Sequence, residues 1–178
     1  WQSEHTIVEI IVPDKPFLVD SIRMCLARLN ITAHLFLNSP ITLKRNAQNE
    51  IMHFVSKNKA SCETCIKETV FLLEIDRQIS SKALAQLTDE LQQVLSEVEQ
   101  VVSDWTPMQD KLDNARTSLS DIPFAIDPNV QQEAIEFVDW LAKHNFTLMG
   151  YRYYKVRPEE GDYIWQPHDE TSLGIMLN

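Results

Sequence analysis

The chain has only three glycines in its 178 residues, and all three lie towards its C-terminal end, at Gly150, Gly161 and Gly174. Loops that hold a dinucleotide or a phosphate need several glycines close together, because a residue without a side chain lets backbone N–H groups approach the phosphate. The spacing of these three glycines allows no such loop. The sequence therefore predicts that this chain holds no nucleotide in that way, and we can assign no catalytic residue to it.

The composition and charge limit the class of protein further. The chain is 44% hydrophobic and 24% charged, as globular proteins are, and no apolar run approaches the roughly 18 residues that span a bilayer. Its net charge of −10 repels phosphate backbones, and its basic residues are scattered singly. We therefore expect neither nucleic acid nor a membrane as a partner.

Three cysteines, at positions 25, 62 and 65, give an odd count that favours a reducing compartment over a disulfide framework. The chain also begins at Trp1, without a Met or a signal-peptide pattern. We interpret it as a segment of a longer, cytoplasmic protein. The spacing Cys62-x-x-Cys65 matches half of a zinc site, yet further ligands are missing nearby, so we interpret it as a chance pattern in a loop and expect no metal.

The first hundred residues alternate apolar strands with amphipathic helices. We predict strands at 5–12, 31–43, 51–55 and 68–76, where β-branched and apolar residues gather. Asp14 is a plausible N-cap of the first helix, and Asn30 is its expected left-handed end. The buried face of that helix follows from the spacing of Leu18, Ile22, Cys25, Leu26 and Leu29.

A second, longer helix is predicted from a cap at Ser80 or Ser81 to about Trp105. Its apolar stripe has spacings of three and four residues and comprises Leu84, Leu87, Leu91, Val94, Val98, Val101 and Trp105. Such a stripe suits either a coiled coil or a helix that covers its own sheet. We favour the second interpretation, because the predicted sheet otherwise lacks a cover.

These elements predict an α+β fold: a two-layer sandwich of an antiparallel sheet with helices on one face, of the split β-α-β, ferredoxin-like kind. We assign residues 1–105 to this domain and 106–127 to a connector with a short helix. Residues 128–178 are expected to begin a further module with a helix and a hairpin. That helix should turn Ala134, Phe137, Val138 and Leu141 inward, and the hairpin should pair a strand at 146–156 with one beginning at 163–165.

Residues 12–34, VPDKPFLVDSIRMCLARLNITAH, resemble an ACT-type regulatory domain in their strand, Asp-x-Pro turn, helix and Asn-Ile strand. The motifs PFLVDSI, LEIDRQ, VVSDW-x-PM and NFTLMGYRYY, spread over about residues 12–173, resemble the N-terminal half of the large bacterial NAD-specific glutamate dehydrogenases. The resemblance implies a parent oxidoreductase that converts L-glutamate, NAD and water to 2-oxoglutarate, ammonia and NADH. Its catalytic domain and its NAD site would lie C-terminal to this chain, which itself would carry no cofactor.

The resemblance also implies a regulatory or assembly role, with the rest of the polypeptide, further copies of the chain and an amino-acid effector as partners. The effector would bind at the turn and helix start, at Asp14, Phe17, Leu18 and Asp20. Effector-binding ACT domains usually have glycine where this chain has Phe17, so a purely structural element is the alternative there. A ligand-free oligomerisation module and a generic amino-acid-binding ACT module of another parent remain alternative functions.

Overall fold

The computed structural model describes residues 4–55, 64–121 and 126–177. The chain divides into two compact units, residues 1–98 and residues 99–178, and each is described by itself. The division falls within one long helix, whereas the sequence suggested that the first domain ends at residue 105.

The first unit contains a four-stranded sheet in the order β1-β4-β2-β3, with antiparallel neighbours throughout. The strands are β1 (Thr6–Pro13), β2 (Ala33–Arg45), β3 (Ile51–Phe54) and β4 (Ile66–Ile75). Strand β4 lies between β1 and β2, and its backbone pairs with both of them. Its alternating apolar residues pack on one face of the sheet. All four strands correspond to strands predicted from the sequence.

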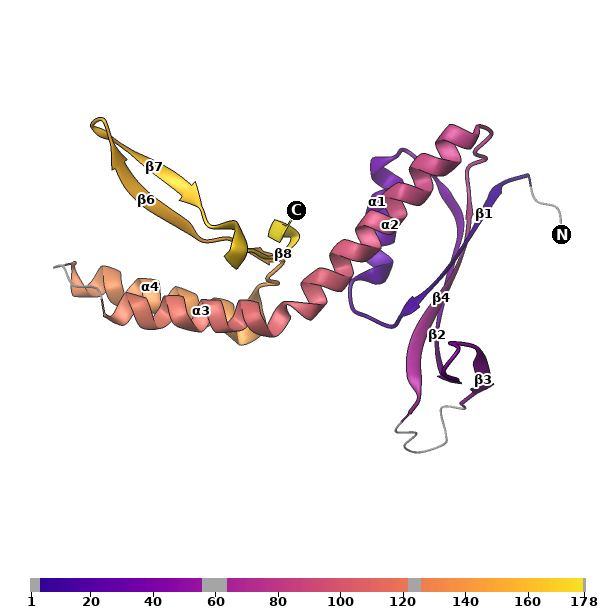
Figure 1. Cartoon of the computed structure of the whole chain (residues 1–178), viewed down its shortest axis with the longest axis horizontal. Coiled ribbons are helices and arrows are strands. Elements are labelled where there is room, and N and C mark those ends of the chain that lie inside the picture. The colour runs from indigo at the N-terminus through magenta and orange to yellow at the C-terminus, as the bar shows by residue number, and fades with distance from the viewer. Residues whose placement is uncertain (1–3, 56–63, 122–125, 178) are drawn as a thin grey trace. The chain divides into compact units, whose positions relative to one another are not determined.

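Two helices, α1 (Leu18–Arg28) and α2 (Ser81–Ser103), cover one face of this sheet (Figure 1). The Oγ of Ser80 accepts a hydrogen bond from the backbone N–H of Ala83 at 3.1 Å, which confirms Ser80 as a cap of α2. An ion pair of 2.5 Å between Arg28 and Glu90 joins the two helices on their outer side. The unit is thus the predicted two-layer α+β sandwich.

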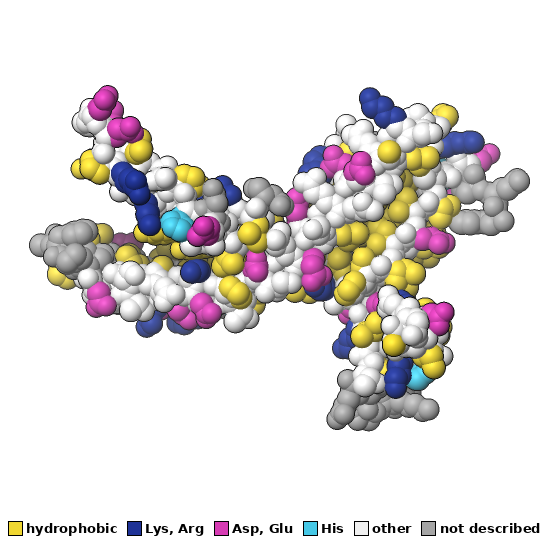
Figure 2. All heavy atoms as spheres, in the orientation of Figure 1, with side chains coloured by type: hydrophobic (Ala, Val, Ile, Leu, Met, Phe, Trp, Pro, Cys, Tyr) yellow, Lys and Arg dark blue, Asp and Glu magenta, His cyan; other side chains and the backbone are white. Residues whose placement is uncertain are grey.

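The core of the first unit lies between the helices and the sheet, where hydrophobic side chains gather (Figure 2). Apolar residues of both layers are buried there: Leu18, Ile22, Cys25, Leu26, Phe71, Leu73, Ile75, Leu87 and Leu91. The α2 residues of this set are buried against their own chain, as the sheet-covering interpretation predicts. Leu84, the first residue of the predicted stripe, is instead 40% exposed.

An irregularity of register between Ala33 and Leu35 decides which residues of β2 reach the core. After it, Phe36 pairs with Leu73 on the helix side and packs edge-on against Phe71, with ring centroids 5.9 Å apart. Leu37 therefore lies on the uncovered face of the sheet, where it is 51% exposed. Leu35 and Leu37 therefore face away from the helices, whereas Ala33, before the irregularity, pairs with the buried Ile75.

The second unit begins with two helices that pack against each other, α3 (Trp105–Ser120) and α4 (Pro128–Trp140). Asp127 caps α4 by accepting a hydrogen bond from the N–H of Asn129 at 2.9 Å, and Pro128 occupies the first helical position. An ion pair of 2.6 Å between Arg116 and Asp139 joins the helices. The polar segment expected to be a connector with a short helix thus forms the regular helix α3.

Helix α4 continues into a single irregular turn, η1 (Leu141–Asn145), in which His144 has a left-handed φ of 61°. The predicted inward face of this helix is wrong in one residue. Phe137 is 59% exposed and stacks on Trp140 with ring centroids 6.3 Å apart, whereas Val138 is half-buried.

The strand expected at 146–156 is divided in two. Its first part, β5 (Gly150–Tyr151), pairs with β8 (Leu173–Gly174), and its second, β6 (Tyr154–Glu159), pairs with β7 (Asp162–Pro167). Short 3-10 turns, η2 (Asp169–Thr171) and η3 (Ile175–Leu177), complete the unit.

Glycine is required at two places in these strands. The turn between β6 and β7 has positive φ at both central residues, 45° at Glu160 and 96° at Gly161, which suits the twist of a two-residue hairpin. Gly174 has a φ of 59°, and a Cβ there would lie 2.2 Å from the carbonyl oxygen of Met149. The close pairing of β5 with β8 therefore depends on the absence of a side chain at this position.

Candidate functional site

The turn between β1 and α1, where the sequence predicts effector binding, is fixed to strand β4. Thr69 donates its hydroxyl to Asp14 Oδ1 at 2.5 Å, and the backbone N–H of Asp14 donates to the carbonyl of Lys67 at 2.9 Å. The carboxylate and the backbone N–H of Asp14 are therefore both hydrogen-bonded to β4, and Asp14 does not cap α1. The prediction that Asp14 is the N-cap is wrong, because its carboxylate finds a hydroxyl donor on the neighbouring strand instead.

Phe17 takes the N-cap position, with φ 70° and ψ −8° in the left-handed region. This backbone conformation costs a residue with a side chain roughly 1–2 kcal/mol relative to glycine. Its side chain is 44% exposed. The backbone at this position thus has a conformation that favours glycine, although the residue carries a large aromatic ring.

No side chain of the N-cap residue satisfies the first turn of α1. The N–H groups at a helix start carry partial positive charge and attract carboxylates, so this turn can accept an anionic group. Leu18 is only 5% exposed and packs in the core, which removes it from contact with a ligand. Asp20 is exposed in the first turn, and its carboxylate would suit the ammonium group of an amino acid.

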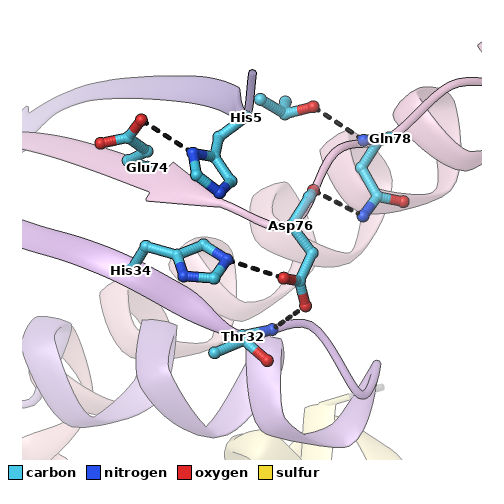
Figure 3. A network of polar contacts seen from close by, with 7 residues as sticks. His5, Thr32, His34, Glu74, Asp76 and Gln78 are labelled. Atoms are coloured by element: carbon cyan, nitrogen blue, oxygen red, sulfur yellow. Dashed lines mark hydrogen bonds and ion pairs between the residues drawn. The ribbon is translucent and has the colours of Figure 1, made fainter. Parts of the chain in front are cut away.

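A network of polar contacts lies at the opposite end of the sheet, where β1 and β2 begin and β4 ends (Figure 3). His5 Nδ1 lies 3.0 Å from Glu74 Oε1, and His34 Nε2 lies 2.8 Å from Asp76 Oδ1. The two imidazole rings face each other with centroids 4.2 Å apart. Each histidine therefore has a carboxylate of its own, and the two pairs are adjacent.

Asp76 is the centre of this network. Its Oδ2 accepts a hydrogen bond from the backbone N–H of Thr32 at 2.7 Å, in addition to the contact with His34. The Thr32 N–H, and then the His34 ring, hold the pKa of the Asp76 carboxyl below its ordinary value, because both stabilise the charged form. The carboxylate thus ties the end of β4 to the start of β2.

Sequence reasoning missed this network because its partners are far apart in the chain. His5 and Glu74 are 69 positions apart, and His34 and Asp76 are 42 positions apart. The histidines also show no spacing of four residues that would place two of them on one face of a helix. The available signal was their shared place at the ends of neighbouring predicted strands.

The cysteines do not form the set of three reduced thiols expected from the sequence. Cys25 is free and buried, and burial raises the pKa of its thiol. Cys65 is disulfide-bonded. Cys62, the other cysteine of the Cys-x-x-Cys pattern, lies outside the described residues.

Among residues 4–55, 64–121 and 126–177, no three His, Cys, Asp or Glu side chains gather as ligands of a metal ion. Within the same residues, none of the helices combines the length and the apolar character needed to cross a membrane.

Comparison with known proteins identifies the relatives of this chain. Residues 1–91 match the family model described as "Glutamate dehydrogenase, ACT1 domain". The chain is 32% identical, over 98% of its length, to an NAD-specific glutamate dehydrogenase of Halomonas elongata, and 33% identical, over 98% of its length, to one of Pseudomonas aeruginosa. It spans 11% of the length of each of these two relatives.

Proposed function

Because the chain belongs to the glutamate dehydrogenase family, with its first 91 residues matching the ACT1 domain, we propose that it is a non-catalytic regulatory and assembly region of an NAD-dependent glutamate dehydrogenase. The full-length enzyme would convert L-glutamate, NAD and water to 2-oxoglutarate, ammonia and NADH in the cytoplasm. The observation that carries this proposal is the match of the ACT1 model to the residues that form the two-layer unit.

The glycine distribution supports a role without a nucleotide site in this segment. NAD would bind elsewhere in the enzyme, because this chain has no glycine before Gly150 and so offers no glycine-rich loop in its first unit. The partners of the segment would then be the rest of its own polypeptide and further copies of the enzyme.

The turn before α1 would be the effector site, taking the carboxylate of an amino acid at the first-turn N–H groups and its ammonium group at Asp20. The uncapped helix start and the glycine-like φ of Phe17 support this assignment. Asp14 would act indirectly, by fixing the turn to Thr69 on β4. Leu18 would only anchor the helix in the core.

A second candidate function is structural: an assembly module that binds no ligand. The ring of Phe17 favours it, because a bulky side chain lies where amino-acid-binding ACT domains usually have glycine, and a ligand would need close access to the backbone.

Calorimetric titration of the 178-residue chain with each of the twenty amino acids separates the two candidates. The effector function predicts saturable binding of at least one amino acid, which Asp20→Asn weakens and Phe17→Gly strengthens. Absence of binding in both the natural chain and Phe17→Gly would leave the assembly function. NADH production by the purified chain in the presence of glutamate would contradict the non-catalytic role itself.

A further inference from the structure

The hairpin β6–β7 in the second unit has one face that carries unpaired positive charge. Lys155 pairs with Gln166 across the two strands, and Arg157 follows two positions after Lys155. Alternate residues of a strand point to the same face, about 7 Å apart, so these three side chains share one face of the hairpin. Figure 2 shows Lys and Arg side chains gathered there beside a histidine.

Neither of these two cations has a carboxylate partner within ion-pair distance among the residues that the structure describes. Arg152, in the same unit, is by contrast occupied: its Nε donates to Ser172 Oγ at 3.2 Å and its Nη2 donates to the carbonyl of Met176 at 2.5 Å. In a chain with a net charge of −10, two neighbouring cations that form no ion pair are not explained by the packing of the hairpin.

These side chains line an open surface pocket of about 480 Å³. Its lining consists of Lys155, Arg157, Gln166, Pro167, His168 and Glu170. All of these residues belong to one short stretch of the second unit, from β6 to η2, and none belongs to the residues that match the ACT1 model.

His168 adds a second observation to the unpaired cations. Its Nδ1 is buried and has no hydrogen-bond partner among the described residues. A buried N–H without an acceptor is costly, so the favoured tautomer has its proton on Nε2. The ring is part of the lining of the site, and a proton on Nε2 makes it a possible hydrogen-bond donor beside Lys155 and Arg157.

We propose that this face of the hairpin is a binding site for a small oxyanion, the carboxylate or phosphate group of a metabolite. A guanidinium group binds such a group with two parallel hydrogen bonds, and the lysine ammonium adds a second positive charge. The Gln166 amide and the His168 ring complete a set of donors, and Pro167 supplies an apolar wall. The site is additional to the effector site proposed at the turn before α1 and does not depend on it.

Glu170 is the single carboxylate in the lining and determines which oxyanion binds best. It repels a ligand that carries only negative charge, whereas it attracts the ammonium group of an amino acid. A phosphate, a keto acid and an amino acid would therefore all bind to Lys155 and Arg157. Their affinities would differ in how they depend on Glu170.

Calorimetry of the 178-residue chain at low ionic strength tests the site, with inorganic phosphate, 2-oxoglutarate and L-glutamate as separate probes. We expect saturable binding of at least one probe, at a site that depends on Lys155 and Arg157. Lys155→Gln and Arg157→Gln should each weaken it by about tenfold or more, the usual effect of losing a charge-assisted hydrogen bond. The matched control is Arg77→Gln, which removes one exposed positive charge from the first unit and should leave the binding unchanged.

Glu170→Gln then identifies the form of the ligand: it should tighten the binding of phosphate and 2-oxoglutarate and weaken the binding of L-glutamate. All of the substituted side chains are exposed in the structure, so the variants should fold normally. An unchanged unfolding temperature confirms this for each variant. The proposal is overturned if no probe binds at millimolar concentration. It is equally overturned if the variants of Lys155 and Arg157 bind as the natural chain does, or if Arg77→Gln weakens binding as strongly as they do.

Discussion

Thr32 and Asp76 exchange two hydrogen bonds: the Thr32 backbone N–H donates to Asp76 Oδ2 at 2.7 Å, and the Asp76 backbone N–H donates to the Thr32 carbonyl at 3.0 Å. The pair joins the residue before β2 to the residue after β4. One side-chain carboxylate therefore continues the pairing of these strands beyond the end of their regular ladder. The energy of this arrangement depends on the charge of Asp76, so it should depend on pH.

Replacing Asp76 with asparagine should destabilise the first unit at neutral pH and much less in acid. The folded-state pKa of Asp76 is lowered from its ordinary value of about 3.8, so its contribution is present above that value and is lost as pH falls through the folded pKa. Denaturant unfolding at pH 7 and at a series of lower pH values below 3.8 measures the difference. The control is Asp89→Asn, since Asp89 makes no hydrogen bond or ion pair among the described residues. A difference that stays constant with pH would contradict the assigned role of the charge.

Leu91→Ala should cost about 2–5 kcal/mol of stability, because it removes a buried side chain from the layer between α2 and the sheet. Leu91 is 5% exposed, whereas Leu84 on the same helix is 40% exposed, so Leu84→Ala is a matched control with a smaller expected loss. Thermal unfolding at two protein concentrations, together with sedimentation sizing, measures both variants. A folded Leu91→Ala chain that merely changes from oligomer to monomer would show that the helix packs on another chain.

Phe17→Gly should be more stable than Phe17→Ala by about 1 kcal/mol. Both substitutions remove the same half-exposed ring, but only glycine relieves the cost of the left-handed φ of 70°. The comparison of the two variants by denaturant unfolding therefore isolates the backbone term. Equal stabilities would mean that the turn changes its conformation once the ring is removed.

Gly174→Ala should disrupt the pairing of β5 with β8, because the new Cβ would lie 2.2 Å from the Met149 carbonyl oxygen and the φ of 59° is unfavourable for alanine. Gly161→Ala is the control: its φ of 96° is also unfavourable, but nothing lies within 4 Å of the added Cβ. The clash should therefore make Gly174→Ala the more destabilised variant by thermal unfolding. Amide exchange at Tyr151 and Leu173 should increase in Gly174→Ala alone.

The sequence alone predicts that the first unit has a layer of helices and a layer of strands. It does not predict which side chains of the two layers touch. The spacing of Leu18, Ile22, Cys25 and Leu26 places one face of α1 in the core, because helical periodicity is a local property. The face that β2 turns to the helices depends instead on an irregularity of register near Ala33, which no alternation of residues reveals.

The second unit was harder to predict because its neighbours in space are not neighbours in the chain. Gly150 leaves the expected long strand to pair with Gly174, and this division follows from the close approach of two backbones rather than from apolar alternation. The candidate sites differ in the same way. The helix start at Phe17 follows from a local motif, whereas the pairing of His5 with Glu74 requires the register of β1 against β4.

The burial of Cys25 makes its thiol a probe of local opening in the first unit. Only the thiolate reacts with alkylating reagents, and Cys25 is both 2% exposed and raised in pKa by burial, so it should react only when α1 separates from the sheet. The rate at which a reagent labels this residue, followed by peptide mapping, then reports the opening of the first unit. Because no substitution is needed, the same measurement in the presence of an amino acid would show whether the proposed effector slows that opening.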